Sequence, residues 1–228
     1  MNAPRPQKPE ASDSPENPPP RARYRTQVRA EIKEHAWRQI ATAGASALSL
    51  NAIAKQMGMT GPALYRYFAS RDDLITELVT DAYRSLADAF HAASAGTQGA
   101  DFADLGHALR AWALEDPHRY LLIYGTPVPG YHAPADVTLI AAEIMTMLLD
   151  ACVPVATDAE STPFDAYLAG NRAWDGGYSA PAQVLHRALV SWTRMHGVLS
   201  LELAGHFTGM AFDPAELYAA ELDRLRTG

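Results

Sequence analysis

Apolar residues recur every three or four positions along most of this 228-residue chain, the spacing that places side chains on one face of an α-helix. One such stripe predicts a helix ending at Gly44, and another predicts a long helix from Ser70 to about Ala93. The first stripe comprises Tyr24, Val28, Ile32, Ala36 and Ile40, and the second Leu74, Ile75, Leu78, Val79, Ala82, Leu86 and Phe90. No stretch shows a competing strand pattern, so the sequence predicts an all-α fold.

The helical pattern continues through the second half of the chain. Pro117, Pro181 and Pro214 each stand at the start of a periodic segment, where the missing backbone N–H of proline costs nothing. The segments predicted to be helical are residues 101–115, 117–125, 135–153, 181–206 and 214–226.

Residues 156–180 form a connection longer than most links between helices, so we expect it to carry a function or a further element. Thr162 is placed to cap a short helix, with Asp165 as the return partner of a capping box. Trp174 and Tyr178 follow among glycines. These two aromatic residues either close a pocket or pack on the nearest apolar surface.

Residues 49–68 combine two short helices with a tight turn. Ser49 is placed to cap the first helix, and Gly58 ends it because glycine accepts the left-handed backbone conformation. Thr60 caps the second helix, whose first turn consists of residues 61–63 and carries small side chains. Two helices joined in this way form a helix-turn-helix unit, whose second helix places its N-terminal residues in the major groove of DNA.

This stretch resembles the DNA-binding signature of the TetR/AcrR family. The likeness rests on the run GMTGPALYRYF at residues 58–68, followed by SRDDL at residues 70–74. It implies an all-helical, homodimeric transcriptional regulator, usually a repressor that a small molecule releases from a palindromic operator. Tyr67 stands where the family usually has histidine, and it keeps a hydrogen-bond donor for a DNA phosphate.

The resemblance implies that the turn from Thr60 to Ala63 reads bases and that the tyrosines after it hold phosphates. Arg25, Arg29 and Lys33 are spaced four residues apart and form a basic stripe, which is either a solvated face or a phosphate contact. The neighbouring motif favours phosphate contact. The residues assigned to DNA are Arg25, Arg29, Ser49, Thr60, Gly61, Pro62, Ala63, Tyr65, Arg66, Tyr67 and Arg71.

The net charge of −7 is unevenly distributed. Residues 21–70 carry eight Lys or Arg against two acidic residues, whereas residues 71–228 carry nine against twenty-one. The basic segment therefore attracts DNA phosphate at one end of the molecule, and the acidic remainder repels it from the other. Residues 1–20 contain seven prolines and almost nothing apolar, so we expect a disordered tail. The expected organisation is this tail, a helix-turn-helix DNA-binding domain over residues 21–70, and a ligand-binding and dimerisation domain over residues 71–228.

A second resemblance covers residues 191–197, SWTRMHG, which are similar to the Trp-His-Gly motif of one C-terminal subclass of the family. It implies that the last two helices pack against their symmetry mates as a four-helix bundle. Gly197 lies within a helix, where glycine costs about 0.5 to 1 kcal/mol relative to alanine, so we expect it to allow close helix approach across the dimer or within the body. The residues assigned to the dimer interface are Trp192, His196, Gly197, Leu199 and Leu203.

The segment after the DNA-binding domain is larger than dimerisation alone requires, and it is rich in aromatic residues and methionine. Such side chains line ligand cavities as well as packed cores. We expect a small, largely apolar effector, and the residues assigned to it are Trp112, Tyr120, Tyr124, Met145 and Trp174. An architectural DNA-binding protein without an effector is the alternative.

The pattern argues against catalysis, a metal site and a cofactor. His196, Glu202 and His206 lie on one predicted helix but cannot converge, since the two histidines are separated by roughly 280 degrees of rotation. Cys152 is the only cysteine, which excludes an internal disulfide, and no neighbour in sequence would activate its thiol. A small helical enzyme built around His196 is the remaining alternative. The sequence contains no signal-like segment and no apolar run of about 20 residues, which predicts a cytoplasmic protein without membrane contact.

Overall fold

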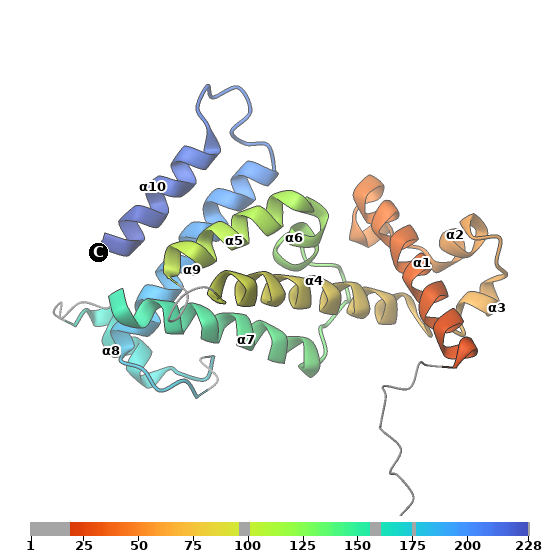
Figure 1. The fold of residues 1–228 in the computed structure, drawn as a ribbon, viewed down its shortest axis with the longest axis horizontal. Helices are drawn as coiled ribbons and strands as arrows, with labels where there is room; N and C mark the ends of the chain where they lie inside the picture. The colour runs from red at the N-terminus through yellow and green to blue at the C-terminus, as the bar shows by residue number, and fades with distance from the viewer. Residues whose placement is uncertain (1–18, 96–100, 156–160, 175–176, 228) are drawn as a thin grey trace, which may run out of the picture.

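The computed structural model describes residues 19–95, 101–155, 161–174 and 177–227, and these contain helices and irregular segments but no strand (Figure 1). The expected all-α class is confirmed. The elements are α1 (Pro20–Ala43), η1 (Ala45–Ala47), α2 (Leu50–Gln56), α3 (Gly61–Leu64), α4 (Arg71–Ser94), α5 (Phe102–Glu115), α6 (Pro117–Tyr124), α7 (Ala135–Cys152), η2 (Val153–Val155), α8 (Pro163–Gly170), α9 (Ala182–Leu203) and α10 (Pro214–Thr227). The tail expected to be disordered lies almost wholly outside the described residues. None of the described helices is long and apolar enough to cross a membrane.

Helices α1 to α3 and the first half of α4 form a head, at the right of Figure 1. Its core is mostly aliphatic, with Ile32 of α1, Ile53 of α2, Leu64 of α3 and Leu74 of α4 all fully buried. The sequence stripes that predicted α1 and α4 supply much of this core, although Tyr24, expected to face the core, is 64% exposed.

The predicted helix caps of the head are mostly confirmed. Ser49 Oγ accepts a hydrogen bond from Ala52 N at 3.3 Å, and Gly58 takes the expected left-handed conformation with φ +66°. Thr60 occupies the N-cap position of α3, but its side chain makes no capping bond. Helix α3 ends at Leu64 and not at the expected Phe68, since the amides of Arg66 and Tyr67 bond three residues back, a tighter turn than the α-helix.

The remaining helices form a body, through which α4 runs as a long axis between α5 and α7 (Figure 1). Helix α9 packs on α7, α8 and α10. The body core contains fully buried residues from each of these layers, among them Leu86, Leu109, Leu148, Leu185 and Leu199. One helix thus has its first half in the head core and its second half in the body core.

A second connection joins head and body at the link between α6 and α7. Val128 in this link and Val137 at the start of α7 are buried in the cluster that forms the head core. Tyr131 Oη donates a hydrogen bond to Thr76 Oγ1 of α4 at 3.2 Å. The body therefore contacts the head beside α4 as well as through it.

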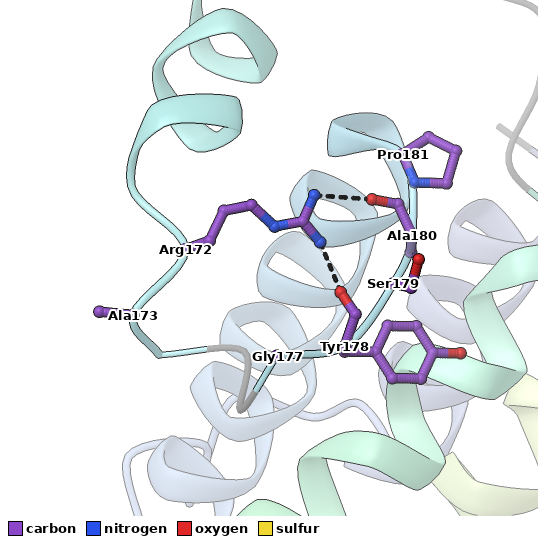
Figure 2. A pocket seen from close by; sticks show the side chains of 7 residues that line it. All are labelled: Arg172, Ala173, Gly177, Tyr178, Ser179, Ala180 and Pro181. Atoms are coloured by element: carbon purple, nitrogen blue, oxygen red, sulfur yellow. Dashed lines mark hydrogen bonds between the residues drawn. The ribbon is translucent and has the colours of Figure 1, made fainter.

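The long connection between α7 and α9 contains α8, as the capping signal predicted. Thr162 and Asp165 form both halves of the capping box, which is confirmed. After α8, the Arg172 guanidinium reaches across the loop and donates to the carbonyl oxygens of Ala180 and Tyr178 at 2.9 and 2.6 Å (Figure 2). The Tyr178 ring points away from Arg172 in Figure 2 and packs against the body core, where its hydroxyl donates to Asp150.

Candidate DNA interface and ligand site

Residues 60–68, α3 with the turn that follows it, are termed the recognition segment. Leu64 and Phe68 anchor it, because both are buried in the head core. Gly61 lies close to α2, since a Cβ atom there would stand 3.4 Å from Asn51 Oδ1. The exposed residues of the segment include Thr60, Pro62, Tyr65 and Arg66. The segment thus has an anchored side and a free side, and the free side carries most of the side chains predicted to meet DNA.

The basic stripe of α1 is largely paired inside the head. Arg29 forms an ion pair with Glu77 of α4 and donates a hydrogen bond to the Tyr67 carbonyl oxygen. Lys33 Nζ lies 2.6 Å from Asp81 Oδ2, also on α4. The structure therefore gives Arg29 intramolecular partners, because its guanidinium turns toward α4 and the recognition segment, and its phosphate contact stays a prediction.

Arg25 lies one turn earlier on α1 and is exposed. Its Nη2 atom donates a long hydrogen bond of 3.5 Å to the Arg66 carbonyl oxygen, which places the start of α1 beside the end of the recognition segment. The other exposed cations of the head include Arg21, Arg23 and Lys55. Most of the exposed cations of the head thus lie in the first turns of α1 or, like Arg66, in the recognition segment, while Lys55 lies on α2 and Arg38 later on α1.

Arg71, also assigned to phosphate, donates into the loop before α2. Its Nε atom bonds the Leu48 carbonyl oxygen at 3.2 Å, and its Nη2 atom bonds those of Ala45 and Ser46 at 3.0 and 3.1 Å. Ser49 follows this loop, and its backbone N–H donates to Gln39 Oε1 at 2.9 Å. Arg71 and Ser49 therefore hold the start of α2 in place, and the phosphate contact of Arg71 stays a prediction.

Five aromatic rings from α4, α6 and α9 meet in the body and form what we term the aromatic cluster. The His196 ring lies 4.3 Å from that of Tyr124 and 4.0 Å from that of Trp192 between centroids. Tyr120 and Tyr83 contact Tyr124 at 5.3 and 6.0 Å. Two residues predicted to bind ligand, Tyr120 and Tyr124, are thereby brought together. Tyr83, Trp192 and His196 were not assigned to a ligand, and only the four-residue spacing of the last two hinted that they act together.

The cluster contains a buried polar group without a protein partner. Tyr120 Oη lies 2.9 Å from both His196 Nδ1 and Ser200 Oγ, while His196 Nε2 is buried with no hydrogen-bond partner among the described residues. Burial lowers the pKa of His196 to about 4, so its ring is neutral at neutral pH. Burial, followed by the neighbouring tyrosines, raises the pKa of Tyr124 well above its ordinary value. The cluster is therefore uncharged and keeps one ring nitrogen free.

The other residues assigned to a ligand are spread through the body. Trp112 donates its indole N–H to Ser85 Oγ at 3.0 Å and borders a surface groove of about 620 Å³ between α4 and α5. Met145 packs partly buried on the body core. Trp174 is 37% exposed, and its role in closing a pocket stays a prediction. These three do not join the aromatic cluster through any described ring contact.

Helix α9 has two distinct sides. Leu199 is fully buried and the His196 ring lies in the aromatic cluster, so both side chains, which were assigned to a dimer interface, face the body core of their own protomer. Trp192 and Leu203 are partly buried on the same core. Gly197 lies on the opposite side, where a Cβ atom would meet nothing within 4 Å. The other exposed residues of α9 are Thr193, Arg194 and Leu201.

The described residues contain no group of three or more His, Cys, Asp or Glu side chains that could hold a metal ion. Cys152 is buried, and burial raises the pKa of its thiol to about 11, which disfavours the reactive thiolate.

Two family models match the chain. Residues 32–78 match the model described as bacterial regulatory proteins, tetR family, and residues 102–225 match the tetracyclin repressor-like C-terminal domain. The first range contains the recognition segment, and the second contains the aromatic cluster apart from Tyr83.

Curated relatives and solved structures agree with these matches. HTH-type transcriptional regulators of Mycobacterium bovis and Mycobacterium tuberculosis are 35% identical over 211 residues, covering 86% of this chain and 90% of each relative. A crystal structure of the regulatory protein SCO4313 has 67% identity and a TM-score of 0.82, covering 91% of this chain and 98% of that one. A tetR family transcription regulator from Shewanella sp. PV-4 shares the fold, with a TM-score of 0.57 at 16% identity over 87% of this chain and 95% of that one.

Proposed function

The chain belongs to the TetR family of helix-turn-helix transcriptional regulators, and we propose that it represses transcription as a homodimer that a small, largely apolar ligand releases from a palindromic operator. It is a regulator and not an enzyme, as are the family and the curated relatives. This removes the enzyme alternative built around His196.

The observation that carries the proposal is the free side of the recognition segment. Residues 60–63 enter the major groove, where the short side chains of Gly61 and Ala63 allow the backbone to approach the bases. Tyr65, Arg66 and Tyr67 hold phosphates, and Arg25 adds charge beside Arg66. The acidic body, with its net charge of −12 over residues 71–228, repels DNA and orients the head toward it.

The dimer forms through the outer side of α9 together with α10. Gly197 allows another helix to approach, since nothing in its own protomer occupies the space beside it. Leu201, on the same side, is an apolar residue that remains 45% exposed in the protomer. Two such faces related by a two-fold axis build the four-helix bundle and space the two recognition segments for two half-sites.

The ligand binds in the body against the aromatic cluster. Its rings supply apolar contact area, and His196 Nε2 supplies one hydrogen bond to an uncharged ligand because the imidazole is neutral. A neutral imidazole can donate or accept at this atom by exchanging tautomers, so a hydroxyl group is a suitable partner. Binding there moves α4, which carries Tyr83 in the body and Leu74 in the head core.

Selection of bound sequences from a random DNA pool tests the first part of this proposal. We expect a palindrome whose half-sites lie about one helical turn, or a multiple of it, apart. Tyr65→Phe should weaken binding to all sequences alike, whereas a change at Ala63 should alter which sequences are selected. An asymmetric motif without a repeat would contradict the dimer.

Titration of a ligand into the protein with and without saturating operator tests the release. Moving operator occupancy from 99:1 to 1:99 requires a preference of about 10⁴, or roughly 5.5 kcal/mol, and operator must weaken ligand binding by the same factor. Equal ligand affinity in both titrations, for every ligand that binds tightly, would favour the architectural alternative.

A further inference from the structure

We propose that Arg29 and Glu77 form a positioning pair, which fixes the recognition segment against α4 and does not itself contact DNA. The proposal rests on the DNA-binding function of the family. It does not depend on the dimer, the repressor role or the ligand.

The contacts of Arg29 join three elements. From α1, its guanidinium pairs with Glu77 of α4 and donates to the Tyr67 carbonyl oxygen at the end of the recognition segment. It also lies over the Phe68 ring, 4.2 Å from the ring centroid. The Arg29 side chain thus contacts both the main chain and the Phe68 ring of the recognition segment. Glu77 of α4 in turn holds the Arg29 guanidinium in place.

The recognition segment needs such support because α3 has only four residues. The last carbonyl groups of a helix have no partner within the helix, and a short helix gains little stability from its own hydrogen bonds. Arg29 supplies a donor to the Tyr67 carbonyl, and Arg25 reaches the Arg66 carbonyl only at 3.5 Å. Of these two hydrogen bonds to the end of the recognition segment, that of Arg29 is therefore the main one, and it adds to the anchoring by the buried Phe68 ring.

Glu77 is the group that holds Arg29 in this direction. Burial, followed by the charge of Arg25, lowers the pKa of the Arg29 guanidinium, and Asp73 raises it. The group nevertheless stays charged, as arginine does in proteins. A partly buried cation beside another cation requires an acidic partner, and Glu77 is that partner in direct contact.

The same two helices contain a natural control. Lys33 and Asp81 pair one turn further along α1 and α4, at 2.6 Å, and this pair also joins a cation of α1 to an acid of α4. Its described contacts are with α4, including a longer one of 3.9 Å from Lys33 to Glu77, and none is with the recognition segment. Neutralising either acid changes the charge of the head by the same amount, but only Glu77 supports the recognition segment.

The decisive experiment compares Glu77→Gln with Asp81→Asn for binding to the selected operator and to random DNA. If charge alone mattered, both changes would tighten binding to all DNA, since each removes a negative charge from the head. The positioning pair predicts instead that Glu77→Gln weakens operator binding about tenfold, or about 1.4 kcal/mol, while Asp81→Asn does not. Binding to random DNA should not fall in either variant. Operator binding by Glu77→Gln as tight as that of Asp81→Asn would overturn the proposal.

The salt dependence separates positioning from phosphate contact at Arg29. Arg29→Gln should weaken operator binding and leave the slope of log K against log salt unchanged, because no phosphate contact is lost. If Arg29 contacted a phosphate, the slope would fall by about 0.9, and that result would contradict the proposal. Lys33→Gln is the matched control, because it also removes one positive charge from α1.

Hydrogen exchange in the free protein provides a readout that requires no operator. We expect the amides of residues 65–68 to exchange faster in Glu77→Gln than in Asp81→Asn, with α2 unchanged in both. Similar exchange in the two variants would show that Glu77 does not hold the recognition segment. Faster exchange throughout the head, with a lower melting temperature, would show a general loss of stability and would also contradict a specific positioning role.

Discussion

The DNA-facing part of the head and the aromatic cluster of the body use polar side chains in different ways. In the head, charged arginines reach from helices to main-chain carbonyl groups, as Arg71 does toward Leu48 and Arg29 toward Tyr67. In the body, a neutral polar group lies inside the aromatic cluster, where His196 meets Tyr120. Donors that cap carbonyl groups fix one arrangement of the loops, which suits a surface that must match a DNA groove. A neutral cluster with an unpaired nitrogen can instead accept an uncharged molecule.

The largest effect that distinguishes the two regions should come from their cores. Leu64→Ala in the head and Leu109→Ala in the body each remove a fully buried side chain, and each should cost about 2 to 5 kcal/mol. Leu64→Ala should abolish operator binding while ligand binding persists, because Leu64 anchors the recognition segment. Chemical denaturation measures the loss of stability, and separate DNA and ligand titrations measure the two binding activities. Loss of both activities in Leu64→Ala would indicate that head and body unfold as one unit.

The next effect is the pH dependence of the body. The pKa of His196 is lowered from 6.5 to about 4, so the unfolded chain binds more protons in this range and stability falls as the pH drops from about 7 toward 4. His196 accounts for up to about 3 kcal/mol of this loss of stability. Urea unfolding over this pH range should show a weaker dependence in His196→Gln than in the parent. His132→Gln, at an exposed position, should retain the full dependence, and identical pH profiles for all three proteins would contradict the assignment.

A smaller effect is expected where Arg71 holds the loop before α2. Arg71→Gln leaves three carbonyl groups without this donor and should cost about 1 to 3 kcal/mol. The matched control is Arg84→Gln, whose half-exposed side chain pairs with Glu143 across the surface and should change stability by less than about 1 kcal/mol. Thermal melting compares the stability of the two variants. Operator binding by Arg71→Gln should also weaken, because the start of α2 is displaced. Equal stability of the variants would indicate that water replaces the lost donor.

The smallest effect is expected at Gly197. Because no atom of the protomer lies near its missing Cβ, Gly197→Ala should stabilise α9 in the monomer by about 0.5 to 1 kcal/mol. Gly197→Leu should leave the protomer folded but weaken the dimer, since the added side chain projects into the proposed interface. Sedimentation over a range of concentrations measures dimerisation of both variants, and thermal melting measures their stability. An unchanged dimer in Gly197→Leu would place the interface elsewhere.

Much of the fold could be predicted from local signals. The apolar stripes of α1 and α4 and the Thr162 capping box involve residues three or four positions apart, and such pairs meet in any helix whatever surrounds it. The helix-turn-helix likewise depends on nearby residues, such as the glycine at 58 that ends α2. These elements appear at the expected places, with α3 shorter than expected.

The sequence by itself determined which residues share a helix face, and only the tertiary structure decided what each face meets. The basic stripe of α1 was visible, but Arg29 meets a carbonyl group 38 residues away, and no spacing in the sequence reports that distance. Trp192 and His196 were visibly on one side of α9, but only the packing of α9 shows that their rings meet Tyr124 in the body. The physical reason is that helix periodicity follows from backbone hydrogen bonds between near neighbours, whereas the partner of a side chain depends on how whole helices pack.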